Sequence, residues 1–343
     1  GTMGTGVLKP LLDRALFPAP QPARYKPGLQ NLVWLPTDSK TKIPCTFFEQ
    51  PKATHLLIYC HGNASDLGTI YYETQGLSNF LNVHLLAMEY CGYGLYDGKP
   101  SEERINEDLT QVYKFLTSTV GVPPERIILF GRSLGTGPTC RLASELCKKK
   151  VKIGGLVLQS PFTSILDAAR SFSSAARFVM AEAWPNVAEI KQVRCPVLFV
   201  HGKKDEVIPH VMSTRLFRAC PSKQKRLMLS QDATHNCFHL VHDLVKPLAN
   251  FLKDIAEADA SFALPMKLDL LGSVSVGFNV HSFSFSKTAS ESSLQAPGNN
   301  KKNNSNDDDN SDVISGDEDV KLQQVAMPIP RRTSMRLCTT ATL

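Results

Sequence analysis

The sequence predicts an α/β fold built on a doubly wound, mostly parallel sheet, and three observations lead to this prediction. Short apolar runs alternate with longer segments of helical period from about residue 32 to 256. Most of the runs are continuous rather than alternating in polarity, as in strands buried on both faces of a parallel sheet. The 343 residues, 42% apolar and 20% charged, can bury a large core and have an ordinary globular composition.

Six apolar runs are the predicted strands, and in chain order they cover residues 55–60, 83–88, 126–130, 155–159, 197–200 and 226–230. Five further segments have the helical period, namely residues 69–81, 101–119, 134–148, 209–219 and 240–257. The second of these begins with Ser101 of "SEER", which is close to an N-cap signature. Residues 273–280, "SVSVGFNV", alternate strictly in polarity, and both an edge strand and an unstructured segment fit that pattern.

Three parts are predicted along the chain. An N-terminal segment that either associates with a membrane or docks on the domain covers residues 1–28, a globular domain covers 29–257, and a tail covers 258–343. From about Ser286 the tail is polar and low in complexity, so it cannot bury enough apolar surface to offset its ordering entropy. The tail is therefore predicted to be largely disordered.

The net charge of +6 is unevenly placed. The tail holds eight Lys/Arg and ten Asp/Glu, so it carries −2 and the rest of the chain carries +8. Basic clusters lie at residues 148–152 and 223–226. They are either solvated helix ends and loops or a surface attracted to anionic membranes.

Nine cysteines occur without the spacing of a metal site or of a disulfide framework. Several, such as Cys60 and Cys195, lie in apolar runs, which favours reduced thiols in a cytoplasmic compartment. The sequence shows no secretory signal, and no apolar run approaches the length needed to cross a bilayer.

Ser133 is the candidate nucleophile. It lies in "GRSLGTG", directly after the apolar run 126–130. In a nucleophile elbow a strand turns sharply into a helix and exposes a serine in a strained conformation. Gly131 and Gly135 fit this turn, because side chains there would collide with the neighbouring strand and helix.

Asp205 and His235 follow the fifth and sixth predicted strands, in "HGKKDEVIP" and "QDATHNC". Since the carboxyl ends of parallel strands meet at one edge of a sheet, both are expected near Ser133. His235 would act as general base and Asp205 would orient its imidazole. Glu206 is the alternative acid. Structural roles are expected for the other histidines near strand ends and on the last helix, His61, His201, His210, His239 and His242.

The loop "HGNASDLG" after the first predicted strand is expected to help form an oxyanion hole. A tetrahedral intermediate needs preorganised N–H donors, and the backbone N–H groups of Asn63 and Leu134 are the candidates. A plain strand-to-helix turn is the alternative for this loop. No cofactor is expected, since the sequence has no ligand-spaced cluster, P-loop or dinucleotide fingerprint, and no nucleic-acid partner is expected either.

The motifs "HGNASDLG", "EYCGYGLYDGKPSE", "PERIILFGRSLGTGPT" and "CPVLFVHGKKDEVIP" together resemble the alpha/beta-hydrolase domain-containing protein 17 family, over roughly residues 16–256. The resemblance implies an alpha/beta-hydrolase fold and a serine hydrolase that removes palmitate from cysteines of membrane-attached proteins. It places Ser133, Asp205 and His235 at the family's triad positions. It also implies S-acylated membrane proteins or acyl lipids as partners, at the cytosolic face of membranes.

Two alternatives share this scaffold. One is a lipid esterase acting on monoacylglycerols or lysophospholipids, and the other is a non-catalytic binding protein. Three departures from the family's pattern stand out. The family's "YDYSGYG" reads "MEYCGYG", Arg132 replaces a glutamine before the nucleophile, and no cysteine precedes Cys45 where the family has an anchoring cysteine cluster.

A helical cap is predicted over about residues 162–192, between two strands of the sheet. Its apolar residues would line a channel for an acyl chain, each buried CH₂ contributing about 0.8 kcal/mol, or would only pack the cap on the core. The candidates for substrate binding are Phe162, Phe172, Phe178, Met180 and Trp184.

Both ends of the chain carry candidate modification sites. If an initiator methionine precedes Gly1, then Gly1 and Thr5 fit the myristoylation pattern; if the chain begins at Met3, Leu8 takes the Ser/Thr position and the pattern fails. In the tail, acids follow Ser315 and two arginines precede Ser334. Kinases are therefore predicted partners there, with an inert tail as the alternative.

Overall fold

The computed structural model describes residues 16–38, 41–172, 183–257, 270 and 336–338, which all belong to the compact unit made of Gly1–Asn279 and Ser334–Leu343. Several predicted features lie outside the described residues. They are Gly1 and the chain up to residue 15, the middle of the cap with Phe178 and Met180, the segment 273–280, and the tail serines Ser315 and Ser334.

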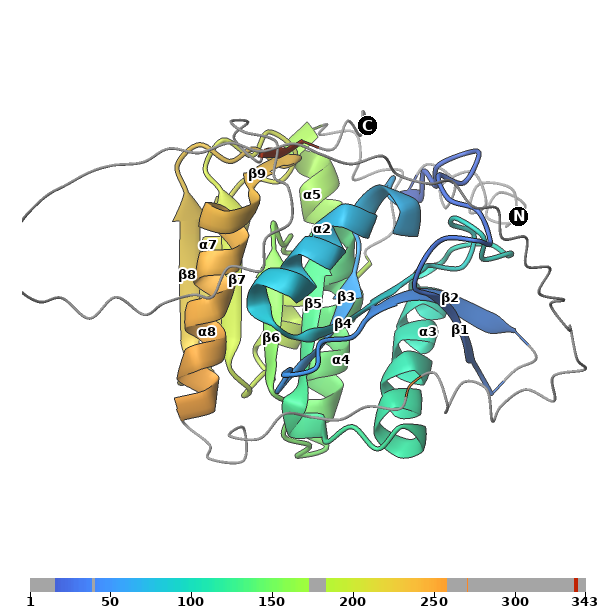
Figure 1. Ribbon diagram of the computed structural model, residues 1–343. Coiled ribbons are helices and arrows are strands. Elements are labelled where there is room, and N and C mark those ends of the chain that lie inside the picture. Colours follow the sequence, from blue (N-terminus) through green and yellow to red (C-terminus); the bar gives the residue numbers. More distant parts are fainter. Residues whose placement is uncertain (1–15, 39–40, 173–182, 258–269, 271–335, 339–343) are drawn as a thin grey trace, which may run out of the picture. The chain divides into compact units, whose positions relative to one another are not determined.

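An eight-stranded sheet forms the centre of the fold, in the order β1-β2-β4-β3-β5-β6-β7-β8 (Figure 1). The pairs from β4 across to β8 are all parallel, whereas β1–β2 and β2–β4 are antiparallel. This confirms the predicted fold class. The strands are β1 Leu32–Pro36, β2 Lys42–Phe48, β3 Leu56–Cys60, β4 His84–Met88, β5 Ile127–Arg132, β6 Gly155–Gln159, β7 Val197–Gly202 and β8 Lys225–Ser230.

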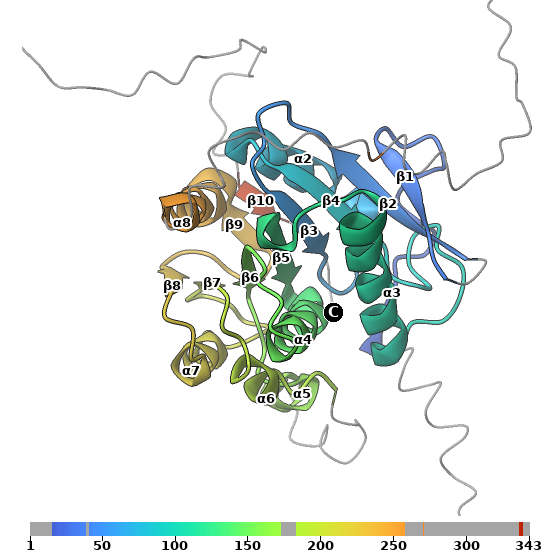
Figure 2. The same ribbon diagram turned by 90° about the horizontal axis from the view of Figure 1, so that it is seen from below.

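Helices cover both faces of the sheet: α2 and α8 lie on one face, and α3, α4 and α7 lie on the other (Figure 2). Short π-helices follow α3 over Phe115–Thr119 and precede α8 over Leu240–Val245. The α-helices are α2 Leu67–Leu81, α3 Glu102–Lys114, α4 Thr136–Lys148, α5 Ile165–Phe172, α6 Asn186–Ile190, α7 Val211–Ala219 and α8 Lys246–Glu257.

Two apolar cores, one on each face of the sheet, explain the continuous apolar runs in the sequence. Successive side chains of a strand point to opposite faces. In β3, Leu56, Ile58 and Cys60 belong to one core, whereas Leu57 and Tyr59 belong to the other. A strand in this position needs apolar side chains on both faces.

Polar caps start two of the helices. The side chain of Asp66 accepts a hydrogen bond from the Thr69 N–H at 2.9 Å, and Ser101 accepts one from the Arg104 N–H at 3.1 Å. Each cap satisfies a backbone donor that the first helical turn leaves without a partner. The N-cap predicted at Ser101 is confirmed.

The structure corrects two predicted helices. The segment 101–119 is regular only to Lys114, and the segment 240–257 is a π-helix as far as Val245 before α8 begins. His239 was expected on that last helix, but it lies in a three-residue strand, β9 Cys237–His239. The change from strand to π-helix within a few residues leaves no regular period for the sequence to show.

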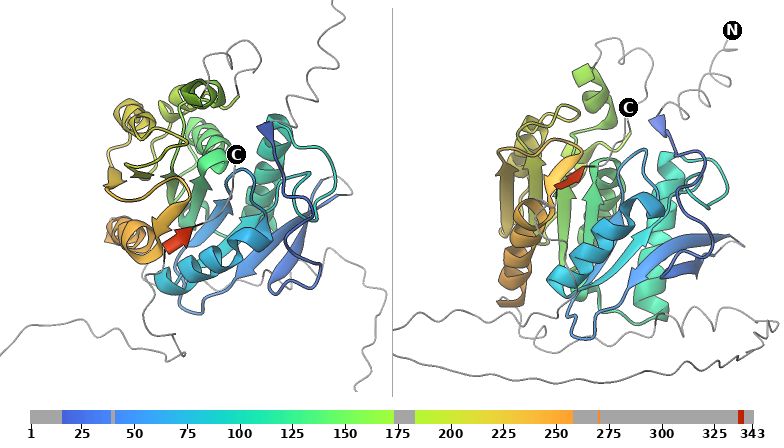
Figure 3. Two further views of the ribbon diagram at one scale, coloured as in Figure 1. Left: turned by 90° about the horizontal axis from the view of Figure 1, so that it is seen from above. Right: turned by 45° about the horizontal axis from the view of Figure 1, so that its top comes forward.

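Part of the predicted tail also forms a strand. β10 Arg336–Cys338 pairs antiparallel with β9, and the two strands lie side by side in Figure 3. Cys237 is disulfide-bonded, and Cys338 is opposite it in the backbone register. The expectation of reduced thiols is therefore wrong for Cys237. Seven other cysteines in the described part of the chain are free, including Cys147 and Cys195.

Within the described ranges, every helix is too short or too polar to serve as a transmembrane span. In the same ranges, no group of three or more His, Cys, Asp or Glu side chains is arranged to hold a metal ion.

Candidate active site

The turn at Ser133 has the geometry of a nucleophile elbow. Ser133 follows β5 with a φ of +50°, in the left-handed region that non-glycine residues rarely adopt. It opens a single 3₁₀ turn, Ser133–Gly135, that leads into α4. A Cβ atom at Gly131 would collide with the Gly135 carbonyl, and one at Gly135 would collide with the Cys60 carbonyl, so the turn requires both glycines as predicted.

His235 lies between Ser133 and Asp205. Its Nε2 is 2.9 Å from the Ser133 Oγ, and its Nδ1 is 2.8 Å from the Asp205 Oδ2. Because the carboxylate is an acceptor, Nδ1 carries the proton and Nε2 is free to accept the serine proton. The three side chains, which come from loops after β5, β7 and β8, thus form one hydrogen-bonded line.

Asp205 is held as a carboxylate. Its Oδ1 accepts the Val207 and Ile208 N–H groups at 2.9 and 2.7 Å, and its Oδ2 receives His235. Burial alone would raise the pKa of Asp205, but hydrogen bonds from His201, His235 and the Ile208 N–H outweigh it and hold the pKa well below its usual range. Glu206, the alternative acid, is exposed.

A second histidine, His201, supports the same carboxylate. Its Nε2 lies 3.1 Å from the Asp205 Oδ2 and 2.8 Å from the Ile208 carbonyl, and its Nδ1 lies 2.6 Å from the Ser213 Oγ. Both neighbours of Nε2 are acceptors, so this nitrogen donates. His201 is fully buried and links the end of β7 to α7, which matches the structural role expected for it.

The loop after β3 lies beside the serine. A Cβ atom at Gly62 would be 3.5 Å from the Ser133 Cβ, so the neighbouring backbone is close to the reacting group. The Asn63 side chain is fixed from two sides: its Nδ2 donates to the Leu16 carbonyl at 2.7 Å, and its Oδ1 accepts the Tyr93 hydroxyl at 2.6 Å. The Asn63 N–H therefore sits in a rigid loop.

Comparison with known proteins identifies relatives of this chain. The alpha/beta hydrolase domain-containing protein aho-3 of Caenorhabditis elegans is 34% identical over 223 residues, which are 65% of this chain and 65% of that protein. The human alpha/beta hydrolase domain-containing protein 17B is 31% identical over 217 residues, 63% of this chain and 73% of the human protein. The chain belongs to the alpha/beta hydrolase domain-containing protein 17 family.

The match to mouse protein 17C, at 33% identity, covers 63% of this chain and 65% of the mouse protein, so the chain matches somewhat less than two thirds of these first relatives. A family model described as "Serine aminopeptidase, S33" matches residues 187–239. Two solved structures share the fold. An alpha-beta hydrolase from Vibrio vulnificus has a TM-score of 0.54 at 18% identity, covering 74% of this chain and 94% of that chain. A Pyrococcus furiosus esterase has a TM-score of 0.53 at 16% identity, covering 66% and 91%.

In this family member, two buried acids that the sequence did not single out hold the site together. Glu89 lies in the "MEYCGYG" segment that departs from the family's pattern, 2.9 Å from the His61 Nε2 and 3.1 Å from the Leu67 N–H. It thereby ties the Asn63 loop to β4 and α2. Glu73 lies on α2 and accepts the Tyr59 hydroxyl at 2.8 Å.

Arg132, the second departure from the family, pairs with Glu73. The Arg132 Nη1 is 3.3 Å from the Glu73 Oε2, and its Nη2 donates to the His235 carbonyl at 3.5 Å. Their side chains are only 6% and 5% exposed. Arg132, the residue before the nucleophile, is therefore joined to α2 through the ion pair and to the loop of the histidine through its second hydrogen bond.

Glu73→Gln should lower the free energy of unfolding by about 3–5 kcal/mol, because it removes the carboxylate that lies against the buried Arg132 charge. The double variant Glu73→Gln/Arg132→Gln should be less destabilised than Glu73→Gln alone. Urea denaturation measures both. The control is Glu145→Gln, which breaks the exposed Arg141–Glu145 pair and should change stability by no more than about 1 kcal/mol. Equal effects for the buried and the exposed pair would contradict the assignment.

The predicted acyl-binding residues fall into two groups. Phe162 and Trp184 are buried, and both belong to the core beside α4. Trp184 packs against Gly137 and edge-on against Phe17, and its indole N–H donates to the Asn106 Oδ1 at 2.9 Å. Phe172 ends α5, with its side chain outside the described residues, as are Phe178 and Met180. Their contact with substrate stays a prediction.

Proposed function

We propose that this chain is a serine hydrolase that cleaves fatty-acyl thioesters on S-palmitoylated proteins, at the cytosolic face of membranes. The observation that carries the proposal is the line from Ser133 through His235 to Asp205, with contacts of 2.9 and 2.8 Å. The strained serine at the start of α4 supports it, because such a turn presents a nucleophile at the positive end of a helix.

The reaction follows from these positions. The Ser133 Oγ attacks the thioester carbonyl carbon while the His235 Nε2 takes its proton. The carbonyl oxygen becomes an oxyanion, for which the Leu134 and Asn63 N–H groups are the proposed donors. The C–S bond then breaks, and His235 returns the proton to the departing cysteine sulfur. A water molecule, deprotonated by His235, then attacks the carbonyl carbon of the acyl-serine. The bond from that carbon to the Ser133 Oγ breaks, His235 returns the proton to the Oγ, and the fatty acid leaves.

Asp205 has two roles in this scheme. It fixes the tautomer of His235 through Nδ1, and its negative charge stabilises the imidazolium that forms when Ser133 loses its proton. Because the pKa of Asp205 lies well below its usual range, the carboxylate stays ionised at neutral pH.

The proposed substrate class rests on the family resemblance and on the apolar surroundings of the serine. Leu134, Phe162 and Trp184 belong to one buried core next to the elbow, where an acyl chain would enter. The N-terminal segment meets the same region, since Phe17 packs on Trp184 with ring centroids 6.2 Å apart. The proposed membrane contact is therefore on this side.

In this proposal the two basic clusters do not make the membrane contact. Residues 148–152 begin at the last residue of α4 and precede β6, and residues 223–226 enter β8, so both clusters lie at the amino ends of parallel strands. Ser133 lies at the carboxyl end of β5. A membrane that delivers an acyl chain to Ser133 faces the opposite edge of the sheet.

A palmitoylated cysteine peptide should be hydrolysed with a kcat/KM at least about tenfold above that for a monoacylglycerol of the same chain length, because the thiolate is the better leaving group. Release of palmitate from both substrates is measured with the wild-type chain and with Ser133→Ala as the blank. A preference for the monoacylglycerol would favour the lipid esterase instead. If neither substrate is hydrolysed and fluorophosphonate does not label the chain, a non-catalytic binding protein would be favoured.

A further inference from the structure

A cavity of about 470 Å³ lies at the edge of the sheet opposite Ser133. Gly154, Pro196 and Gln224, which line it, directly precede β6, β7 and β8, so it opens at the amino ends of these strands. Its volume is within the range of about 300–1,000 Å³ typical of small-molecule sites. None of its lining residues belongs to the candidate active site.

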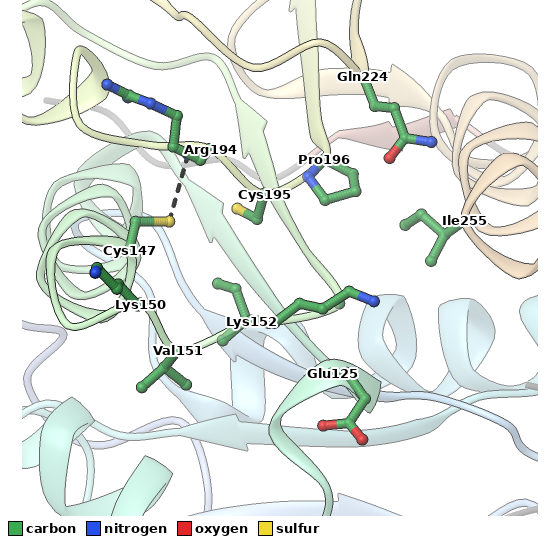
Figure 4. Close-up of a pocket in the computed structure, with 12 residues that line it drawn as sticks. Glu125, Cys147, Lys150, Val151, Lys152, Arg194, Cys195, Pro196, Gln224 and Ile255 are labelled. Atoms are coloured by element: carbon green, nitrogen blue, oxygen red, sulfur yellow. Dashed lines mark hydrogen bonds between the residues drawn. The ribbon is translucent and has the colours of Figure 1, made fainter. Parts of the chain in front are cut away.

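Two thiols face each other in this cavity. Cys147 lies in the last turn of α4, Cys195 lies two residues before β7, and Figure 4 shows their side chains pointing toward one another. Cys195 is 8% exposed, whereas Cys147 is only partly buried. A molecule in the cavity therefore meets Cys147 first. The Arg194 N–H donates to the Cys147 Sγ at 3.3 Å.

These contacts shift the pKa values of the two thiols in opposite directions. The hydrogen bond from Cys195 lowers the pKa of Cys147 to about 6. Burial acts against this shift, whereas the N–H and the charge of Arg194 add to it. The same hydrogen bond between the thiols, together with burial, raises the pKa of Cys195 well above its ordinary value. A thiolate is the nucleophile in thiol chemistry, so Cys147 is the attacking sulfur and Cys195 the protonated partner beside it.

Among the described residues, the lining of the cavity holds Lys150, Lys152 and Arg194 and one carboxylate, that of Glu125. The Arg194 guanidinium is turned to the Lys191 carbonyl, to which its Nη1 donates at 2.7 Å, so the positive charge offered to an anion comes from the two lysines. The two lysines belong to the basic cluster 148–152. The other cluster supplies Gln224 to this cavity and Lys223, Lys225 and Arg226 to an adjoining one, where Arg226 is paired with Asp254. Two clusters far apart in the sequence thus gather at one edge of the sheet, where their field attracts anions.

We propose that Cys147 and Cys195 form a thiol–disulfide exchange site that takes an anionic small-molecule disulfide. The Cys147 thiolate attacks one sulfur of the disulfide, whose S–S bond breaks and releases one thiolate. The Cys195 sulfur then loses its proton to that thiolate and attacks the Cys147 sulfur, which releases the second thiolate. The two cysteines are oxidised to one disulfide, and the small disulfide is reduced to two thiols.

Glutathione disulfide added to the full chain tests the site, with each cysteine mapped by mass spectrometry after alkylation. The wild type should gain a Cys147–Cys195 disulfide, and Cys195→Ser should stop at a glutathione adduct on Cys147. Cys147→Ser should leave Cys195 unmodified. The control is Cys91→Ser, which removes a free thiol of similar exposure (7% against 8%) and should react like the wild type.

Two rate measurements separate this site from an ordinary surface thiol. The rate should rise up to about pH 6 and then level off, whereas a thiol with the ordinary pKa of about 8.5 keeps gaining rate through neutral pH. Lys150→Gln/Lys152→Gln should slow glutathione disulfide about tenfold but not the uncharged hydroxyethyl disulfide. The exposed Lys52→Gln is the charge control. The proposal would be overturned if another cysteine were modified first, or if no Cys147–Cys195 disulfide formed. It would also be overturned if the lysine substitutions slowed the reactions of both disulfides equally.

Discussion

Ser133→Ala should lower kcat for a palmitoyl thioester by at least about 10⁴-fold, since the triad acts as a unit and what remains comes from binding and the oxyanion donors. The substitution removes one oxygen and one hydrogen bond to His235, so the free energy of unfolding should change by no more than about 1 kcal/mol. Steady-state kinetics and urea denaturation of the purified variant give both values.

Ser160 supplies a matched control for this variant. It has a φ of +49°, is buried, and follows the end of β6 as Ser133 follows β5. Its hydroxyl makes no hydrogen bond to the described residues, and no histidine reaches it. Ser160→Ala should therefore leave kcat within about threefold of wild type. A similar loss in both variants would mean that distortion at the strand ends, rather than a missing nucleophile, explains the Ser133→Ala result.

Asp205→Asn should lower kcat by about 10⁴-fold with little change in KM. The amide Nδ2 would donate to His235 at Nδ1 and move the ring proton to Nε2, which could then no longer accept the proton of Ser133. Nitrogen NMR of the His235 ring would show directly which of the two ring nitrogens carries the proton.

Glu206→Gln is the matched control for the acid. Glu206 is adjacent in sequence but exposed, and it makes no contact with His235 among the described residues. Its kcat should stay within about twofold of wild type. A larger loss in Glu206→Gln than in Asp205→Asn would show that the wrong carboxylate has been assigned.

The sequence predicted the parallel part of the sheet because burial on both faces leaves a local mark. Each of β3 to β8 appears as a short apolar run, and all six were predicted to within a few residues. The hairpin of β1 and β2 was not predicted from the sequence. β1 is buried on one face only, with the alternating pattern of a partly exposed strand, and β2 begins with Lys42 and contains Pro44. Its place in the sheet depends on pairing with β4, about 40 residues away in the chain.

The residues of the candidate site likewise divide into those with a local sequence signal and those without one. Ser133, Asp205 and His235 were found because strand ends converge, and the glycines of the elbow were required by its geometry. Glu73, Glu89 and Arg132 were not assigned roles, since a buried charge looks like a surface charge until its partner is known. Their contacts join segments that are remote in sequence. Arg132, for example, contacts Glu73 on α2 and the His235 carbonyl after β8. The pairing of Cys237 in a disulfide was missed for the same reason.

The central claim is that Ser133 carries the acyl group during turnover, and the most direct measurement is to find the residue that holds it. The chain is mixed with a palmitoyl thioester, quenched in acid within the first turnover, digested and analysed by mass spectrometry. The account predicts a palmitoyl ester on Ser133 in the wild type and no acyl group in Ser133→Ala. An acyl group on a cysteine or on another serine, or turnover without any acylated residue, would contradict it.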